Sequence, residues 1–156
     1  MRTKSLLGTA CCGLVMVLAG CGGGSERLSA PEYAREVSEL CRRGDRAVAR
    51  IEIPPLGSPR SAARAMTSVV VVQRDTIEEL RGVRPPESLA GTVQRWIALL
   101  DQGADELELM SVRLRAGHTG EAVDYGAKAT TLLDRARELV APLHVTSCRG
   151  PVLPTV

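Results

Sequence analysis

Two histidines and a short series of carboxylates are the side chains in this sequence that could bind a metal ion or transfer a proton. Asp101, Asp105 and Glu108 follow one another at helical spacing, so their carboxylates would share one face of a helix. Such a group could bind calcium or act as acid and base, but no calcium-binding loop accompanies it. His118 and His144 fall at the ends of expected helices, where a loop or capping role is the simpler interpretation. We therefore expect a solvated surface here and assign no catalytic residue.

The sequence also lacks the short motifs that are typical of enzymes and metal sites. It contains no Glu-x-x-His pair, which a ferritin-like two-metal site needs twice, and no His-Glu-x-x-His, Gly-x-Ser-x-Gly or Gly-x-x-x-x-Gly-Lys. Its cysteines do not have the spacing of a redox motif or a zinc site. We expect a protein that is not an enzyme and has no cofactor or metal, which makes a hydrolase or metalloenzyme the weakest hypothesis.

The first 21 residues have the pattern of a lipoprotein signal peptide. Arg2 and Lys4 form a positive segment, and residues 5–17 form an apolar one that is shorter than the roughly 20 residues of a membrane span. The next four residues are Leu18-Ala19-Gly20-Cys21. They resemble the lipobox of bacterial lipoproteins, a family in which the cysteine thiol receives a diacylglyceryl group and a peptidase then cleaves before it.

Lipidation of Cys21 would determine how the chain is organised. Residues 1–20 would be removed as signal peptide, and the diacylglyceryl anchor would hold the mature protein at the extracytoplasmic face of the cell membrane. Residues 21–29 are rich in Gly and Ser, a composition typical of a flexible tether. Two alternatives remain. Cys11 or Cys12 could be the modified residue, after a shorter apolar segment, or an ordinary secretory cleavage could leave Cys21 unmodified.

Two cysteines then remain in the mature domain, Cys41 and Cys148. The extracytoplasmic space is oxidising, which favours a disulfide between them. Residues 143–148 are long enough to fold back along the first helix, at about 3.3 Å per residue. We expect a Cys41–Cys148 disulfide, and two free thiols are the alternative.

Charge and composition argue against nucleic acid as a partner and in favour of helices. Without the two basic residues of the signal peptide, the chain carries 18 basic and 18 acidic residues, so no excess of positive charge is available for nucleic acid. Phe is absent, and the aromatic residues are Tyr33, Trp96 and Tyr125. The core must therefore be aliphatic, which suits closely packed helices better than a β-sandwich.

Apolar residues recur at steps of three and four through four segments, the pattern of amphipathic helices. Pro-Pro pairs separate the first three segments and Gly117 separates the last two. The expected helices span residues 30–52, 59–83, 86–116 and 120–141. Short connections between them predict an all-α fold, an antiparallel up-down-up-down four-helix bundle over residues 30–148. Residues 149–156 would be a C-terminal tail. The same periodicity assigns Trp96 to the core, and in the last helix it assigns Tyr125, Leu132 and Leu139.

One part of the expected bundle is more apolar than an amphipathic helix requires. Residues 69–72 are four consecutive valines, and residues 96–100 are nearly as apolar. A hairpin of the two helices would place Val71 beside Leu99 at mid-bundle. Val70, Val71 and Leu99 are therefore a candidate apolar contact patch for a partner, a second copy or a lipid. The alternative is a broader core that covers all of them.

The chain as a whole resembles the small helical lipoproteins common in actinobacteria, in its lipobox, its tether, its Pro-Pro pairs and its last cysteine. That resemblance is architectural and implies no activity. We expect a membrane-anchored, non-enzymatic binding or interaction module of the cell envelope, with an envelope protein as the partner. The alternative is a carrier of a small apolar ligand or lipid, because small core residues could either leave space inside the bundle or let helices approach closely. These residues are Gly44, Gly103, Ala129 and Ala136.

Overall fold

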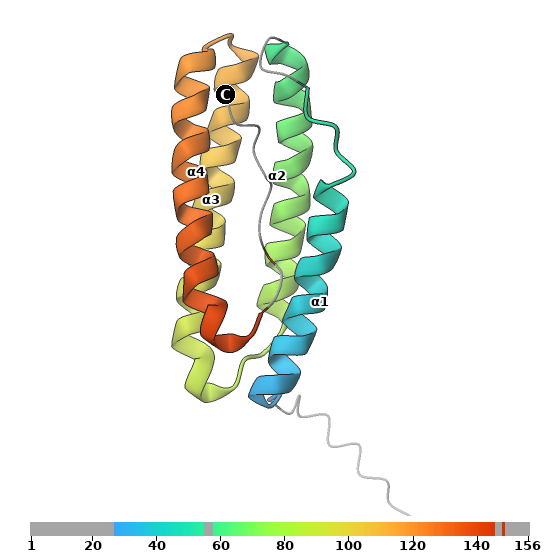
Figure 1. Ribbon diagram of the computed structural model, residues 1–156, viewed down its shortest axis with the longest axis vertical. Coiled ribbons are helices and arrows are strands. Elements are labelled where there is room, and N and C mark those ends of the chain that lie inside the picture. Colours follow the sequence, from blue (N-terminus) through green and yellow to red (C-terminus); the bar gives the residue numbers. More distant parts are fainter. Residues whose placement is uncertain (1–26, 55–57, 146–147, 149–156) are drawn as a thin grey trace, which may run out of the picture.

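The computed structural model of the chain describes residues 27–54, 58–145 and 148, all of them helical or connecting segments. The four α-helices are α1 (Ala30–Val48), α2 (Pro59–Gly82), α3 (Ala90–Arg115) and α4 (Thr119–Val140). Short 3₁₀ helices precede α3 (η1, Glu87–Leu89) and follow α4 (η2, Ala141–Leu143). Successive helices run in opposite directions (Figure 1), so the predicted all-α four-helix bundle is confirmed. The predicted signal peptide, Cys21, most of the tether and the tail from residue 149 onward lie outside the described residues.

The helices pack chiefly against their neighbours in the sequence, α1 against α2, α2 against α3 and α3 against α4. After η2 the chain returns to α1, because Cys148 lies beside Cys41. Leu143, Val145 and Cys148 also pack against the buried cluster formed by all four helices. The segment after the last helix thus contributes to the core, as the predicted return along the first helix requires.

Local hydrogen bonds set the beginning of α1. Ser29 precedes the helix, and both its hydroxyl and its backbone N–H donate to the Glu32 carboxylate, at 2.6 and 2.9 Å. The hydroxyl bond and then the backbone bond lower the pKa of Glu32. Pro31 stands in the first turn, where its missing N–H costs no helical hydrogen bond.

The end of α1 differs from the prediction. The helix stops at Val48, four residues before the expected boundary at 52. Ile51 and Ile53 still pack against the core, but they do so from a non-helical connection. Their spacing resembles a helical stripe, yet a residue that precedes a proline is disfavoured in the α conformation, and Ile53 precedes Pro54.

Gly117 ends α3 at the predicted place. Its φ of 81° lies in the left-handed region that favours glycine. The Gly117 N–H donates to the Leu114 carbonyl at 3.1 Å, and the His118 N–H donates to the Arg113 carbonyl at 2.9 Å. These bonds satisfy carbonyls that would otherwise lack a hydrogen-bond partner at the end of the helix. The next helix, α4, begins directly afterwards.

The core is aliphatic around two aromatic side chains. Trp96 and Tyr33 are almost fully buried, together with side chains from each helix. Burial raises the pKa of Tyr33 to about 12, because a phenolate at this position would lose its contact with water. A second buried cluster, with Met66, Leu107 and Leu114 among its members, continues the core toward the opposite end of the bundle.

The core face of α4 corrects the sequence analysis. We expected Tyr125, Leu132 and Leu139 to be buried, but the buried positions are the next residues along, Gly126, Leu133 and Val140. Together with Ala122, Ala129 and Ala136, which are buried as expected, either set repeats at steps of three and four, so periodicity alone does not choose between them.

A close contact with α3 makes that choice. A methyl group at Gly103 would lie only 3.0 Å from Leu133 Cδ2, so α4 approaches α3 with Leu133 against a glycine. Tyr125 is left at the edge of the core, with Lys128 Nζ 4.8 Å and Arg113 Cζ 5.9 Å from its ring centre. At these distances both cations lie within reach of a cation–π interaction.

Candidate functional site

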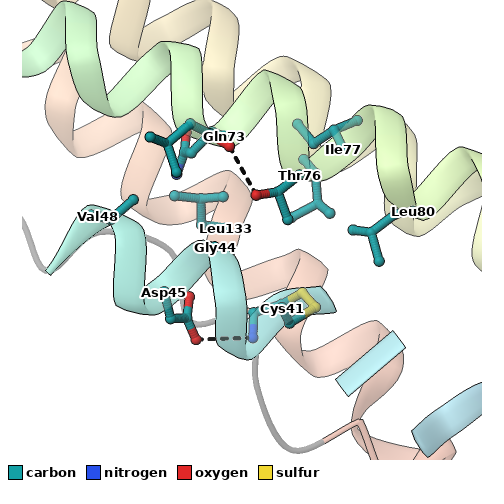
Figure 2. A pocket seen from close by; sticks show the side chains of 12 residues that line it. Cys41, Gly44, Asp45, Val48, Gln73, Thr76, Ile77, Leu80 and Leu133 are labelled. Atoms are coloured by element: carbon teal, nitrogen blue, oxygen red, sulfur yellow. Dashed lines mark hydrogen bonds between the residues drawn. A yellow bond between two sulfur atoms is a disulfide. The ribbon is translucent and has the colours of Figure 1, made fainter. Parts of the chain in front are cut away.

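Cys41 and Cys148 form a disulfide in the structure, the pairing that the sequence predicts. Their Cα atoms are 4.6 Å apart, within the range that a disulfide spans. Cys41 is buried in α1, and the Cys148 N–H donates to Asp45 Oδ2 at 3.3 Å, one turn further along the same helix (Figure 2). The disulfide and this hydrogen bond together hold Cys148 of the returning chain against α1.

An apolar cavity of about 40 Å³ lies beside this disulfide. Its walls come from all four helices, for example Val48, Ile77, Leu100 and Leu133, and both cysteines line it (Figure 2). Polar groups stand at its edge. The Thr76 hydroxyl donates to the Val72 carbonyl at 2.8 Å, whereas Gln73 Oε1 is buried without a hydrogen-bond partner among the described residues.

The size of the cavity limits what it can hold. About 40 Å³ has room for a water molecule, whereas pockets for small-molecule ligands usually enclose about 300–1,000 Å³. The cavity therefore has no room for a lipid chain or a ligand of ordinary size.

Small core residues bring helices together in this bundle instead of leaving space. A methyl group at Gly44 would lie 2.5 Å from Thr76 Oγ1 and 3.1 Å from Thr76 Cγ2, closer than normal contacts allow. Gly103 meets Leu133 in the same way. The two glycines thus let α1 approach α2 and α3 approach α4.

We expect the Gly44→Ala variant to be less stable than the wild type by about 1–2 kcal/mol. The added methyl group forces Thr76 or the whole of α1 to shift, and overpacking of this kind outweighs the gain of about 1 kcal/mol in helix propensity. Urea unfolding followed by circular dichroism measures the difference.

Gly91→Ala is the matched control, because a methyl group at Gly91 would meet nothing within 4 Å. This variant should be as stable as the wild type or more stable. Adding Thr76→Ala to Gly44→Ala should recover most of the loss. Equal stabilities of the Gly44 and Gly91 variants would contradict a close contact between α1 and α2.

The three residues of the candidate contact patch differ in how far their side chains are exposed. Val70 is only 6 % exposed and belongs to the core, so its assignment to an exposed patch was wrong. Its side chain faces the bundle because it continues the buried stripe of Met66 and Val69. Leu99 is partly buried against the core, and Val71 is 54 % exposed.

Two exposed apolar side chains that the sequence analysis did not assign lie on α3. Leu109 and Val112 are 40 % and 48 % exposed and stand one turn apart on one face of the helix. Val71 of α2 lies at a similar height, since Thr67, one turn before it, contacts Ser111 at 2.9 Å, and Arg74 pairs with Glu108 at 2.8 Å. We call Val71, Leu109 and Val112 the exposed patch. Leu109 and Val112 fall off the heptad positions of α3, which is the sequence signal that could have identified them.

The carboxylate series lies on the surface, as expected, and is paired with arginines. Arg74 Nη2 lies 2.7 Å from Asp105 and 2.8 Å from Glu108, and Arg81 pairs with Asp101. The bond to Asp105, followed by that to Glu108, raises the pKa of Arg74. These pairs connect α2 with α3 along the side that carries the exposed patch.

The two histidines lie at opposite ends of the bundle. His118 precedes α4, with Nδ1 3.4 Å from Glu121 Oε1. His144 follows η2 with a φ of 57°, and its side chain is exposed. Within the described ranges, no group of three or more His, Cys, Asp or Glu residues is placed to hold a metal ion.

The helices that the structure describes include none that is both long enough and apolar enough to cross a membrane. No protein-family model, curated protein or solved structure matches the chain.

Proposed function

We propose that this chain is a lipid-anchored lipoprotein of the cell envelope, and that its bundle is a non-enzymatic interaction module. The lipobox-like sequence that ends at Cys21 supports the anchor and the extracytoplasmic location. The observation that carries the interaction role is the exposed patch, in which Leu109 and Val112 of α3 lie near the height of Val71 of α2. Exposed apolar side chains on neighbouring helices are a candidate surface for a protein contact.

Side-chain contacts connect α2 and α3 on the side that carries the exposed patch. The Arg74 ion pairs and the Thr67–Ser111 contact tie α2 to α3 around it. We expect these contacts to limit movement of α2 against α3, which would reduce the entropy lost when a partner binds. The alternative function, a carrier of a ligand inside the bundle, receives no such support, because the cavity beside the disulfide measures only about 40 Å³.

Crosslinking in intact cells tests the interaction role. The full-length chain is treated with a short lysine- and carboxylate-reactive crosslinker, and its adducts are resolved by electrophoresis and identified by mass spectrometry. We expect a discrete adduct with one envelope protein. Val112→Asp should reduce this adduct at least about tenfold, because it places a charge in the centre of an apolar contact.

Ala98→Asp is the matched control, since Ala98 is exposed on the same helix but lies more than three turns from Val112. This variant adds the same charge and should leave the adduct unchanged. Absence of any discrete adduct, or equal losses for the two variants, would contradict the proposed role of the exposed patch.

A further inference from the structure

A groove of about 540 Å³ lies at the end of the bundle where α1 begins. One wall is the face of α1 that carries Ala34, Arg35 and Arg42, and the other comes from Leu89 of η1 and from Leu143 and His144 at the end of η2. The start of α1, the α2–α3 connection and the end of α4 meet at this end (Figure 1). Segments distant in the sequence thus form one surface that is mostly apolar.

Among the described residues, the charged side chains that line the groove are two arginines. Arg35 and Arg42 stand two turns apart on α1, and His144 lines the other wall. Arg42 forms an ion pair with the Glu39 carboxylate, and the same carboxylate pairs with Arg46 at 3.3 Å. The charge of Arg35 lowers the pKa of Glu32, and within the described residues the Arg35 guanidinium takes part in no ion pair, so it could bind another anion. A lining that combines apolar side chains with two arginines fits a ligand that has both an anionic group and hydrocarbon.

The position of the groove indicates where such a ligand would come from. Ala30 stands nine positions after Cys21, and an extended chain spans at most about 3.3–3.6 Å per residue. If Cys21 carries the anchor, as the proposed function states, the start of α1 stays within roughly 30 Å of the membrane. Membrane lipids would then be present near the groove at high effective concentration.

We propose that this groove binds an anionic phospholipid of the membrane that anchors the chain. The phosphate lies between Arg35, Arg42 and His144, and the first carbons of the acyl chains contact Ala34, Leu89 and Leu143. Binding orients the bundle with the start of α1 toward the membrane and with the Arg60 end of α2 away from it. The proposal rests on the proposed function for the source of the lipid, but the chemistry of the groove is independent of the anchor.

Native mass spectrometry of the full-length protein in detergent micelles tests the proposal. The protein is titrated with phosphatidylglycerol or with phosphatidylcholine of the same acyl chains, and each bound lipid appears as a mass adduct. We expect phosphatidylglycerol to bind at lower concentration than phosphatidylcholine. Arg35→Gln/Arg42→Gln should weaken phosphatidylglycerol binding about tenfold, since an arginine near an anionic lipid contributes about a factor of five and Arg42 is partly neutralised. Arg35→Gln alone leaves the Glu39 pair intact and should give a smaller loss.

Arg60→Gln/Arg64→Gln is the matched control, because it removes the same charge from two exposed positions at the opposite end of the bundle. Phosphatidylglycerol binding should be unchanged in this variant. Equal losses for the two double variants, or equal binding of the two lipids by the wild type, would overturn the proposal. The same spectra report the mass on Cys21, so an unacylated chain that still prefers phosphatidylglycerol would contradict the anchor and leave the groove supported.

Discussion

The Cys21→Ala variant of the full chain should carry no diacylglyceryl group and should remain uncleaved after Gly20. Only a thiol at this position can form the thioether, and the lipobox resemblance implies that cleavage follows lipid attachment. The wild type should instead begin at Cys21 and carry a mass increase that corresponds to diacylglycerol. We expect the acylated fraction to change from nearly complete to undetectable, which intact mass spectrometry of the purified protein measures directly.

Mass is the decisive measurement because cell fractionation is ambiguous for this variant. An uncleaved precursor would keep the apolar residues 5–17 and could stay with the membrane without any acyl chain. In the wild type, by contrast, each buried CH₂ of the acyl chains contributes about 0.8 kcal/mol, so the mature protein should resist extraction by salt.

Cys12→Ala distinguishes between the cysteines that could be modified. If Cys21 is the modified residue, this variant should be acylated and cleaved like the wild type. Acylation that survives in Cys21→Ala and disappears in Cys12→Ala would move the anchor to the earlier position. A cleaved but unacylated wild-type protein in the culture medium would instead show ordinary secretion and remove the basis of the proposed location.

The fold could be predicted because its signals are local. Apolar residues at steps of three and four indicate the helices, and Gly117 and the Pro-Pro pairs indicate where the helices end. The disulfide pairing followed from elimination, since Cys41 and Cys148 are the cysteines that remain beyond the lipobox. The helices can be inferred from one segment of sequence at a time, and the pairing needs only a count of the cysteines that remain.

The features that could not be predicted depend on two or more segments. The rotation of α4 depends on the contact between Leu133 and Gly103 of another helix, and the pattern within α4 contains no information about that contact. The burial of Val70 could not be predicted for a similar reason. Four consecutive valines leave open which of them face the core. The basic groove combines residues near positions 35, 89 and 144, so no motif in the sequence could mark it.

The Cys148→Ala variant should lose on the order of 4 kcal/mol of the free energy of unfolding. The disulfide joins residues 107 positions apart, and a loop of about that length restricts the unfolded chain by about 4–5 kcal/mol in the chain-entropy model. For a domain of this size the loss corresponds to a decrease of roughly 15 °C in Tm. Thermal unfolding followed by circular dichroism at 222 nm should show this decrease while the helical signal at low temperature is retained.

Reduction of the wild type provides the internal control for this prediction. Dithiothreitol should lower the Tm of the wild type to that of Cys148→Ala and should leave the variant unchanged. A larger loss in the variant than in the reduced wild type would assign the difference to packing, because Cys148 also contacts the core and lines the cavity. Two thiols that react with iodoacetamide in the unreduced, unfolded wild type would contradict the disulfide itself.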